Sequence, residues 1–129
     1  SIEKNDLVRR MMAMRHTPQR FSLGLISDQK VSPKNAYHWT EFLHQKTSFL
    51  GGGEVLARKL DLGVTYIHIR EVSRGYYRAR FELLTLSAPE TAKGEITEQF
   101  ARMLEANIQE QPHLWLWSHN RWKWDRMTE

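Results

Sequence analysis

A β-hairpin signature in the middle of the chain restricts the fold more than any other feature. Residues 64–69 and 76–84 are rich in β-branched and aromatic side chains, and Ser73-Arg74-Gly75 between them is typical of a tight turn. Strands joined by so short a connection run antiparallel and lie side by side. The sequence therefore predicts a sheet that contains this hairpin.

Three other segments have the spacing of helices. Residues 5–16, 54–60 and 96–108 carry apolar side chains every three or four positions. The second segment follows the glycine triplet Gly51-Gly52-Gly53, and the third ends before Pro112. We expect a helix at each place.

Two shorter segments complete the predicted order of elements. Residues 21–26 alternate and then form a short apolar run, which predicts a buried strand that ends at Ser27-Asp28. Residues 37–43 are interpreted as a short helical turn. The resulting order of helices and strands predicts an α/β fold with a mixed sheet flanked by helices.

Length and composition limit the chain to one domain of ordinary globular type. Its 129 residues can hold one core, and the net charge of +4 is compatible with anionic partners. Cysteine is absent, which excludes disulfides and thiolate metal sites. The six histidines show no metal-ligand spacing, so we expect no metal and no cofactor. No apolar run approaches the roughly 20 residues of a membrane span.

Two features mark candidate binding sites. Asp28 follows the predicted buried strand, at the strand end where α/β sheets commonly hold functional groups; an ordinary turn residue is the alternative. The glycine triplet opens a helix, where backbone N–H groups can bind an anion such as phosphate. A plain flexible loop explains the triplet equally well.

The end of the chain is unusually rich in tryptophan. Four indoles lie within ten residues and are interleaved with basic side chains: Trp115, Trp117, Trp122 and Trp124. Such a mixture is typical of a membrane interface, or of a groove for single-stranded nucleic acid. The simplest alternative is that some of these rings fill the core.

These segments resemble the bacterial lipid A biosynthesis acyltransferases, the lauroyl and myristoyl branch of the lysophospholipid acyltransferase superfamily. Residues 24–29 are similar to the family's strand that ends in an Asp-Gln pair, and residues 42–52 to its segment that leads through a threonine to a glycine and a helix. Residues 74–77 resemble a turn found in one subgroup. Residues 111–123 closely match the family's terminal signature. The resemblance covers nearly the whole chain.

The resemblance implies transfer of a fatty acyl chain from an acyl carrier protein to a hydroxyl of a lipid A precursor, in lipopolysaccharide synthesis at the cytoplasmic face of the inner membrane. The family's catalytic pair is a histidine with an acid five positions later. The fifth residues after the six histidines are Phe21, Leu43, Phe49, Ser73, Ser118 and Trp124. We therefore expect residues 1–129 to be the carboxyl-terminal portion of one acyltransferase domain, inactive alone because a hydroxyl nucleophile needs a base.

The resemblance also implies roles for individual residues. Asp28 would support the charge of the site without attacking the substrate. The other implied substrate contacts are Gln29, Thr47, Gly51, Gly52, Arg70, Arg74, Arg121 and Lys123. Trp122 and Trp124 would lie at the membrane interface.

Other readings of the sequence remain open. A non-catalytic module that binds acyl chains or a membrane surface is the first alternative. A module that binds single-stranded nucleic acid is the second, although no nucleic-acid-binding signature accompanies the aromatic residues. An incomplete sheet would also leave an unpaired edge through which copies could associate.

Overall fold

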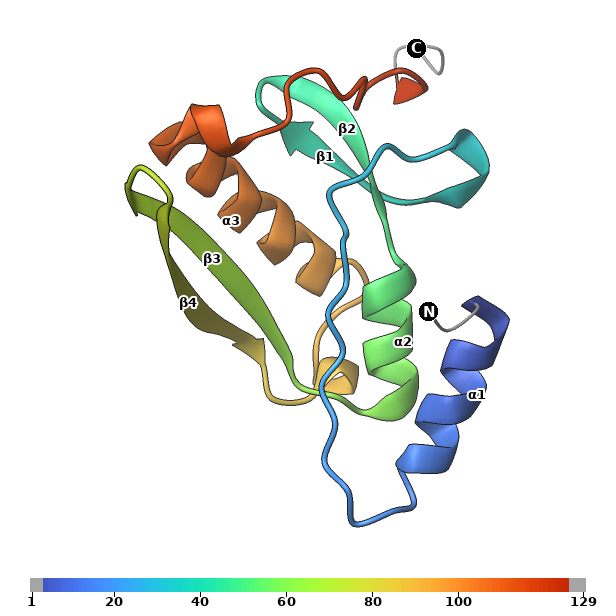
Figure 1. Cartoon of the computed structure of the whole chain (residues 1–129). Coiled ribbons are helices and arrows are strands. Elements are labelled where there is room, and N and C mark those ends of the chain that lie inside the picture. Colours follow the sequence, from blue (N-terminus) through green and yellow to red (C-terminus); the bar gives the residue numbers. More distant parts are fainter. Residues whose placement is uncertain (1–3, 126–129) are drawn as a thin grey trace.

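The computed structural model describes residues 4–125 (Figure 1). Its helices and strands are α1 (Lys4–Met14), β1 (Ala36–Phe42), β2 (Gln45–Leu50), α2 (Gly52–Leu60), β3 (Val64–Ser73), β4 (Tyr76–Thr85) and α3 (Glu95–Glu110). Short 3-10 helices lie at Pro33–Asn35, Ala88–Glu90 and Pro112–Leu114. The predicted α/β class is confirmed, and a helix is present at each of the three predicted places.

The predicted hairpin is present as β3 and β4, which pair antiparallel with Ile67 opposite Phe81. Gly75 in its turn has φ of 81°, a left-handed conformation that glycine adopts without steric cost. Within the described residues, β3–β4 is one of two separate antiparallel sheets of two strands each, and the other is β1–β2.

The β1–β2 hairpin corrects the helical turn expected at residues 37–43. Phe42 pairs with Gln45, so only Leu43 and His44 form the loop, and both have positive φ (48° and 62°). Two such residues give the hairpin turn usually formed by Asn and Gly. The Leu43 N–H donates a hydrogen bond of 2.6 Å to the Glu105 carboxylate on α3. A contact distant in sequence therefore supports a turn without the usual turn residues.

The strand predicted at residues 21–26 is wrong. This segment is extended but pairs with no strand among residues 4–125. Leu25 and Ile26 are 50% and 77% exposed. Strand assignment needs hydrogen bonds from a neighbouring strand, and the apolar pattern of a segment does not supply them.

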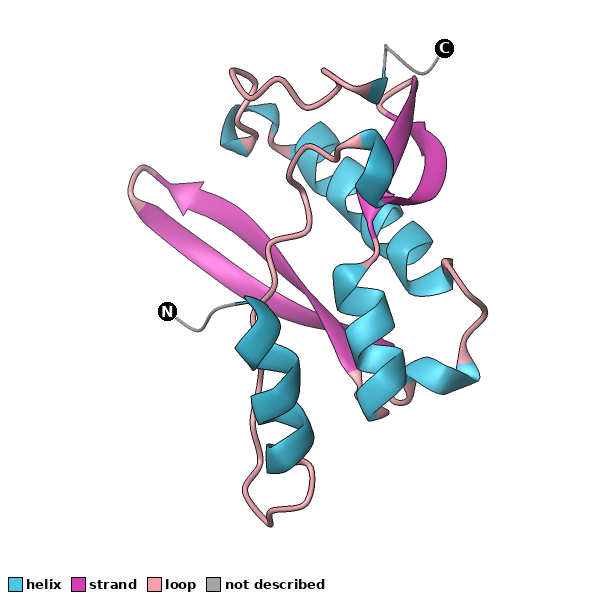
Figure 2. Cartoon of the chain, turned by 90° about the vertical axis from the view of Figure 1, so that its right-hand side faces the viewer, coloured by secondary structure: helices cyan, strands magenta, loops and turns pink. Residues whose placement is uncertain are grey.

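Helix α3 lies between the two hairpins and organises the main core (Figures 1 and 2). Phe42 and Phe49 of the β1–β2 sheet are fully buried against Ala101 and Ile108 of α3. The two phenyl rings meet edge to face, with centroids 5.3 Å apart. Burial of one such side chain contributes about 2 kcal/mol.

Helices α1 and α2 form a second, smaller apolar cluster. Met11 of α1 packs against Leu56 and Leu60 of α2. Among the described helices, none is both long and apolar enough to cross a bilayer.

Candidate functional site

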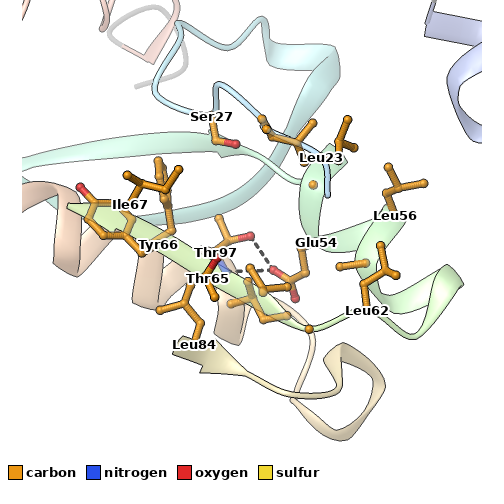
Figure 3. A pocket seen from close by; sticks show the side chains of 18 of the residues that line it. Leu23, Ser27, Glu54, Leu56, Leu62, Thr65, Tyr66, Ile67, Leu84 and Thr97 are labelled. Carbon is orange, nitrogen blue, oxygen red and sulfur yellow. Dashed lines mark hydrogen bonds between the residues drawn. The ribbon is translucent and has the colours of Figure 1, made fainter. Parts of the chain in front are cut away.

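An apolar cavity of about 460 Å³ opens between the extended segment 21–27, α2, β3 and α3 (Figure 3). A second cavity of about 420 Å³ continues beside it, toward the end of α3. Leu25, Tyr66 and Phe100 line both cavities. Each volume lies in the range of small-molecule binding sites. We define the two together as the paired cavity.

Tyr66 of β3 is the polar group between the two parts of the paired cavity. Its hydroxyl donates to the Asn107 side-chain oxygen at 3.3 Å, and its ring packs edge to face on Phe100. Burial, and secondarily the negative charge of Asp28, raise the pKa of Tyr66 to about 12. The phenol is therefore neutral at physiological pH.

A buried carboxylate, Glu54 of α2, lies in the wall of the first part. Its two oxygens accept hydrogen bonds from the backbone N–H groups of Gly94 and Thr97, at 2.7 and 3.1 Å. The Thr97 hydroxyl donates to the same carboxylate (Figure 3). These donors form the amino-terminal end of α3, where a negative charge is favourable. Glu54 thus joins α2 to α3.

Asp28 lies at the second part of the paired cavity, although no strand leads to it. Its carboxylate accepts a weak hydrogen bond from the Gln29 side chain at 3.4 Å. Asp28 is partly exposed and Gln29 is exposed. The extended segment therefore brings Asp28 to the cavity, whereas Gln29 does not line it.

The predicted residues in β2 and at the start of α2 have different surroundings. Thr47 is fully buried, and its hydroxyl donates to the Gln45 carbonyl. Gly51 lies so close to Tyr37 that an added Cβ would be 2.0 Å from the ring, whereas Gly52 has open space. Close packing explains the first glycine, and nothing in the structure explains the second.

The predicted arginines of the β3–β4 hairpin are on the surface. Arg70 forms an ion pair of 3.3 Å with Glu110 of α3. Arg74 is exposed in the turn. Neither residue lines the paired cavity.

The terminal signature packs inward against β2. Arg121 is 1% exposed; its guanidinium donates to the Ser48 carbonyl and lies 3.6 Å from the Asp125 carboxylate. Desolvation lowers the pKa of Arg121, with Asp125 and Asp28 opposing this effect. Asp125 also accepts a 3.2 Å hydrogen bond from the Ser48 N–H. The structure thus uses Arg121 internally, and its predicted contact with a headgroup stays a prediction.

The two predicted interface tryptophans differ in their contacts. Trp122 packs against the main core and donates its indole N–H to the Thr47 hydroxyl at 2.8 Å. Trp124 is half-buried, with the exposed Lys123 ammonium 4.8 Å from its ring centroid. Lys123 is therefore exposed, whereas both tryptophans are partly buried.

Sequence reasoning missed an acid–base pair between β1 and α3. His38 Nε2 lies 2.6 Å from a Glu98 oxygen, and the Thr40 hydroxyl donates to the other oxygen at 3.0 Å. Partial burial raises the pKa of Glu98, but the hydrogen bonds and the charges of Arg102 and His38 outweigh it, so this pKa lies below its usual value. Sixty positions separate the pair, so no local pattern could reveal it. It does not line the paired cavity.

Among residues 4–125, no group of three or more His, Asp or Glu side chains is placed to hold a metal ion.

Comparison with known families defines the class of protein. Residues 2–124 match the family of bacterial lipid A biosynthesis acyltransferases. Because the match spans almost the entire sequence, the chain belongs to this family. Comparisons with curated proteins and with solved structures found no match.

Proposed function

We propose that this chain is the carboxyl-terminal, acyl-chain-binding portion of an enzyme that transfers a fatty acyl chain from acyl carrier protein to a hydroxyl of a lipid A precursor. The reaction would take place at the cytoplasmic face of the inner membrane. The family match supports acyl transfer, and the apolar paired cavity carries the proposed role of this portion. A fatty acyl chain is an elongated apolar ligand, and burial of each methylene contributes about 0.8 kcal/mol.

Each chemical group of the reactants is assigned to a different part of the structure. The hydrocarbon would occupy the paired cavity beside Leu25 and Phe100. Asp28 at its second part would contribute negative charge near the reacting end, with Gln29 beside it. Anionic headgroups or carrier-protein carboxylates would meet the exposed Arg70 and Arg74.

We expect no turnover from this chain alone. A hydroxyl that attacks a thioester needs a base to accept its proton. The described histidine–glutamate contacts, at His38, His68 and His113, all lie outside the paired cavity. None is therefore in reach of an acyl group bound there.

Equilibrium dialysis with radiolabelled lauric acid tests the proposal. We expect saturable binding that Leu25→Trp weakens, because the indole would fill the space shared by both parts of the paired cavity. Exclusion of only two methylenes corresponds to about tenfold weaker binding. Leu116→Trp makes the same substitution at an exposed position outside the cavity and is the matched control.

Two outcomes would contradict the proposal. Absence of saturable lauric acid binding would remove the cavity's proposed ligand. Equal weakening by Leu25→Trp and Leu116→Trp would show that binding occurs elsewhere.

The alternative function is a module that binds acyl chains or a membrane surface without catalysis. The position of the histidine–glutamate pairs outside the paired cavity favours it. The two functions are separated by adding this chain to the protein's own upstream segment, if one is encoded, and measuring acyl transfer. The inward packing of Trp115 and Trp122 does not favour the nucleic-acid alternative, since stacking on bases needs exposed ring faces.

A further inference from the structure

The β3–β4 hairpin carries an uncovered apolar face. Side chains alternate between the two faces of a strand, and the observed register places five large residues on one face. Two of them, Ile67 and Ile69, also line the paired cavity. We define the other three, all on β4, as the outer apolar face: Tyr77, Phe81 and Leu83. Phe81 is 68% exposed and Leu83 is 55% exposed.

Exposure is especially extensive along β4. Every residue from 76 to 83 is exposed, on both faces of the strand. Both cartoon views show the β3–β4 turn extending beyond the helices (Figures 1 and 2). An apolar surface of this kind on a ribbon that projects into solvent marks an interaction site.

Arginine side chains are concentrated in the turn of the hairpin and on the face opposite the outer apolar face. Four of them lie between residues 70 and 80: Arg70, Arg74, Arg78 and Arg80. Glu71 is the one acidic residue in that stretch. Within the part of the chain that the structure describes, Arg80 has a weak exposed contact with Glu82 at 3.5 Å, and Arg74 and Arg78 have no ion pair. Residues 70–83, which include the turn and the outer apolar face, therefore carry four arginines against Glu71 and Glu82, a net charge of +2.

We propose that this part of the hairpin, residues 70–83, docks on the surface of an anionic phospholipid bilayer. Phe81, Leu83 and Tyr77 would enter the boundary between headgroups and acyl chains, as the apolar side chains of interfacial segments do. The arginines lie on the other face of a ribbon only two strands wide. Their long side chains can therefore extend past its edge to the lipid phosphates.

The combination of surfaces favours a bilayer over an acidic carrier protein. Both partners are anionic, but only the bilayer also offers a continuous apolar layer for the outer apolar face. Tyrosine is moreover a typical residue of membrane interfaces. The inference deepens the proposed function, since it rests on a lipid acceptor that resides in a membrane, and it assigns the membrane contact to the hairpin rather than to Trp122.

Sedimentation with vesicles of phosphatidylglycerol and phosphatidylcholine tests the charged part of this surface. The chain should bind these vesicles and fail to bind vesicles of phosphatidylcholine alone. Arg78→Ser/Arg80→Ser should weaken binding about 30-fold, since each arginine near an anionic surface contributes about fivefold. Arg9→Ser/Arg10→Ser removes the same charge from exposed positions of α1 and should have little effect.

A second pair of substitutions tests the apolar part. Phe81→Ser/Leu83→Ser should weaken vesicle binding, whereas Met12→Ser, at an exposed position of α1, should not. Circular dichroism is the control that each variant is folded. Loss of binding that is equal for hairpin and control variants would overturn the proposal.

Two further measurements separate this inference from the proposed function. None of the residues in the two hairpin variants lines the paired cavity, so lauric acid binding should be unchanged in both. A chain that binds lauric acid but no anionic vesicle would overturn the docking surface alone. Hairpin variants that lose binding to acyl carrier protein while keeping vesicle binding would assign the surface to the carrier instead.

Discussion

Removal of the Asp125 carboxylate is expected to destabilise the fold strongly. Arg121 is 1% exposed, and the Asp125 carboxylate lies 3.6 Å from its guanidinium. Asp125→Ala would leave this cation buried without the carboxylate and would remove the acceptor of the Ser48 N–H. Loss of one partner of a buried ion pair costs about 3–5 kcal/mol. This is a large part of the total stability of a typical domain, which is about 5–15 kcal/mol.

Urea unfolding followed by tryptophan fluorescence measures the effect. The transition midpoint of Asp125→Ala should fall by about 2 M if the slope is typical of a small domain. Arg121→Met/Asp125→Ala removes both charges and should be less destabilised than the single variant, because no buried charge is then left uncompensated. Glu82→Ala breaks the exposed pair with Arg80 and should cost less than about 1 kcal/mol. A midpoint for Asp125→Ala no lower than that of Glu82→Ala would refute the assigned role of the buried pair.

Three other predictions address the cavity wall and the loop before α2. The pKa of Tyr66 is raised to about 12 from 10.0, so this phenol loses its proton at a lower pH in the unfolded chain than in the folded one. Its contribution to the free energy of unfolding should be complete below pH 10 and decline as the pH rises through 12. Urea unfolding at several pH values should show a less steep decline for Tyr66→Phe. Glu54→Gln should cost about 1–3 kcal/mol in the same assay, because the buried N–H groups of α3 lose their charged acceptor; an unchanged midpoint would contradict the joining of α2 to α3. Gly51→Ala should cost about 1–3 kcal/mol through its clash with Tyr37, whereas Gly52→Ala should be neutral or stabilising, and the reverse order would refute the packing explanation.

The elements that the sequence predicted well are those whose signals are local. The helix at residues 96–108 and the β3–β4 hairpin follow from periodic apolar positions and from a turn with glycine, and both are present. The family was also predicted correctly, since it depends on short motifs in a fixed order, above all residues 111–123.

The elements that were predicted wrongly from the sequence depend on contacts between distant residues. The turn at Leu43 and His44 lacks the usual turn residues and is supported by Glu105 on α3. The segment at residues 21–26 has the apolar pattern of a strand but no pairing partner in the described structure. Local propensity cannot supply either contact.

In the candidate site, too, positions could be predicted from local signals, but contacts between distant residues could not. Asp28 was predicted from its position after an apolar run; the structure places it at the paired cavity, and its role stays a prediction. Glu54 was visible only as an acid in the first turn of a helix, although its carboxylate holds the start of α3. Arg121 has the residue type of an anion contact, yet the fold places it beside Asp125 in the interior.

The sequence by itself determined the helices, the central hairpin and the family, because periodicity and short motifs act over a few neighbouring residues. Only the tertiary structure decided where charge is buried and where apolar surface is left open. It placed Arg121 inside and the outer apolar face outside, since burial depends on which distant elements pack together and not on the chemical type of a side chain.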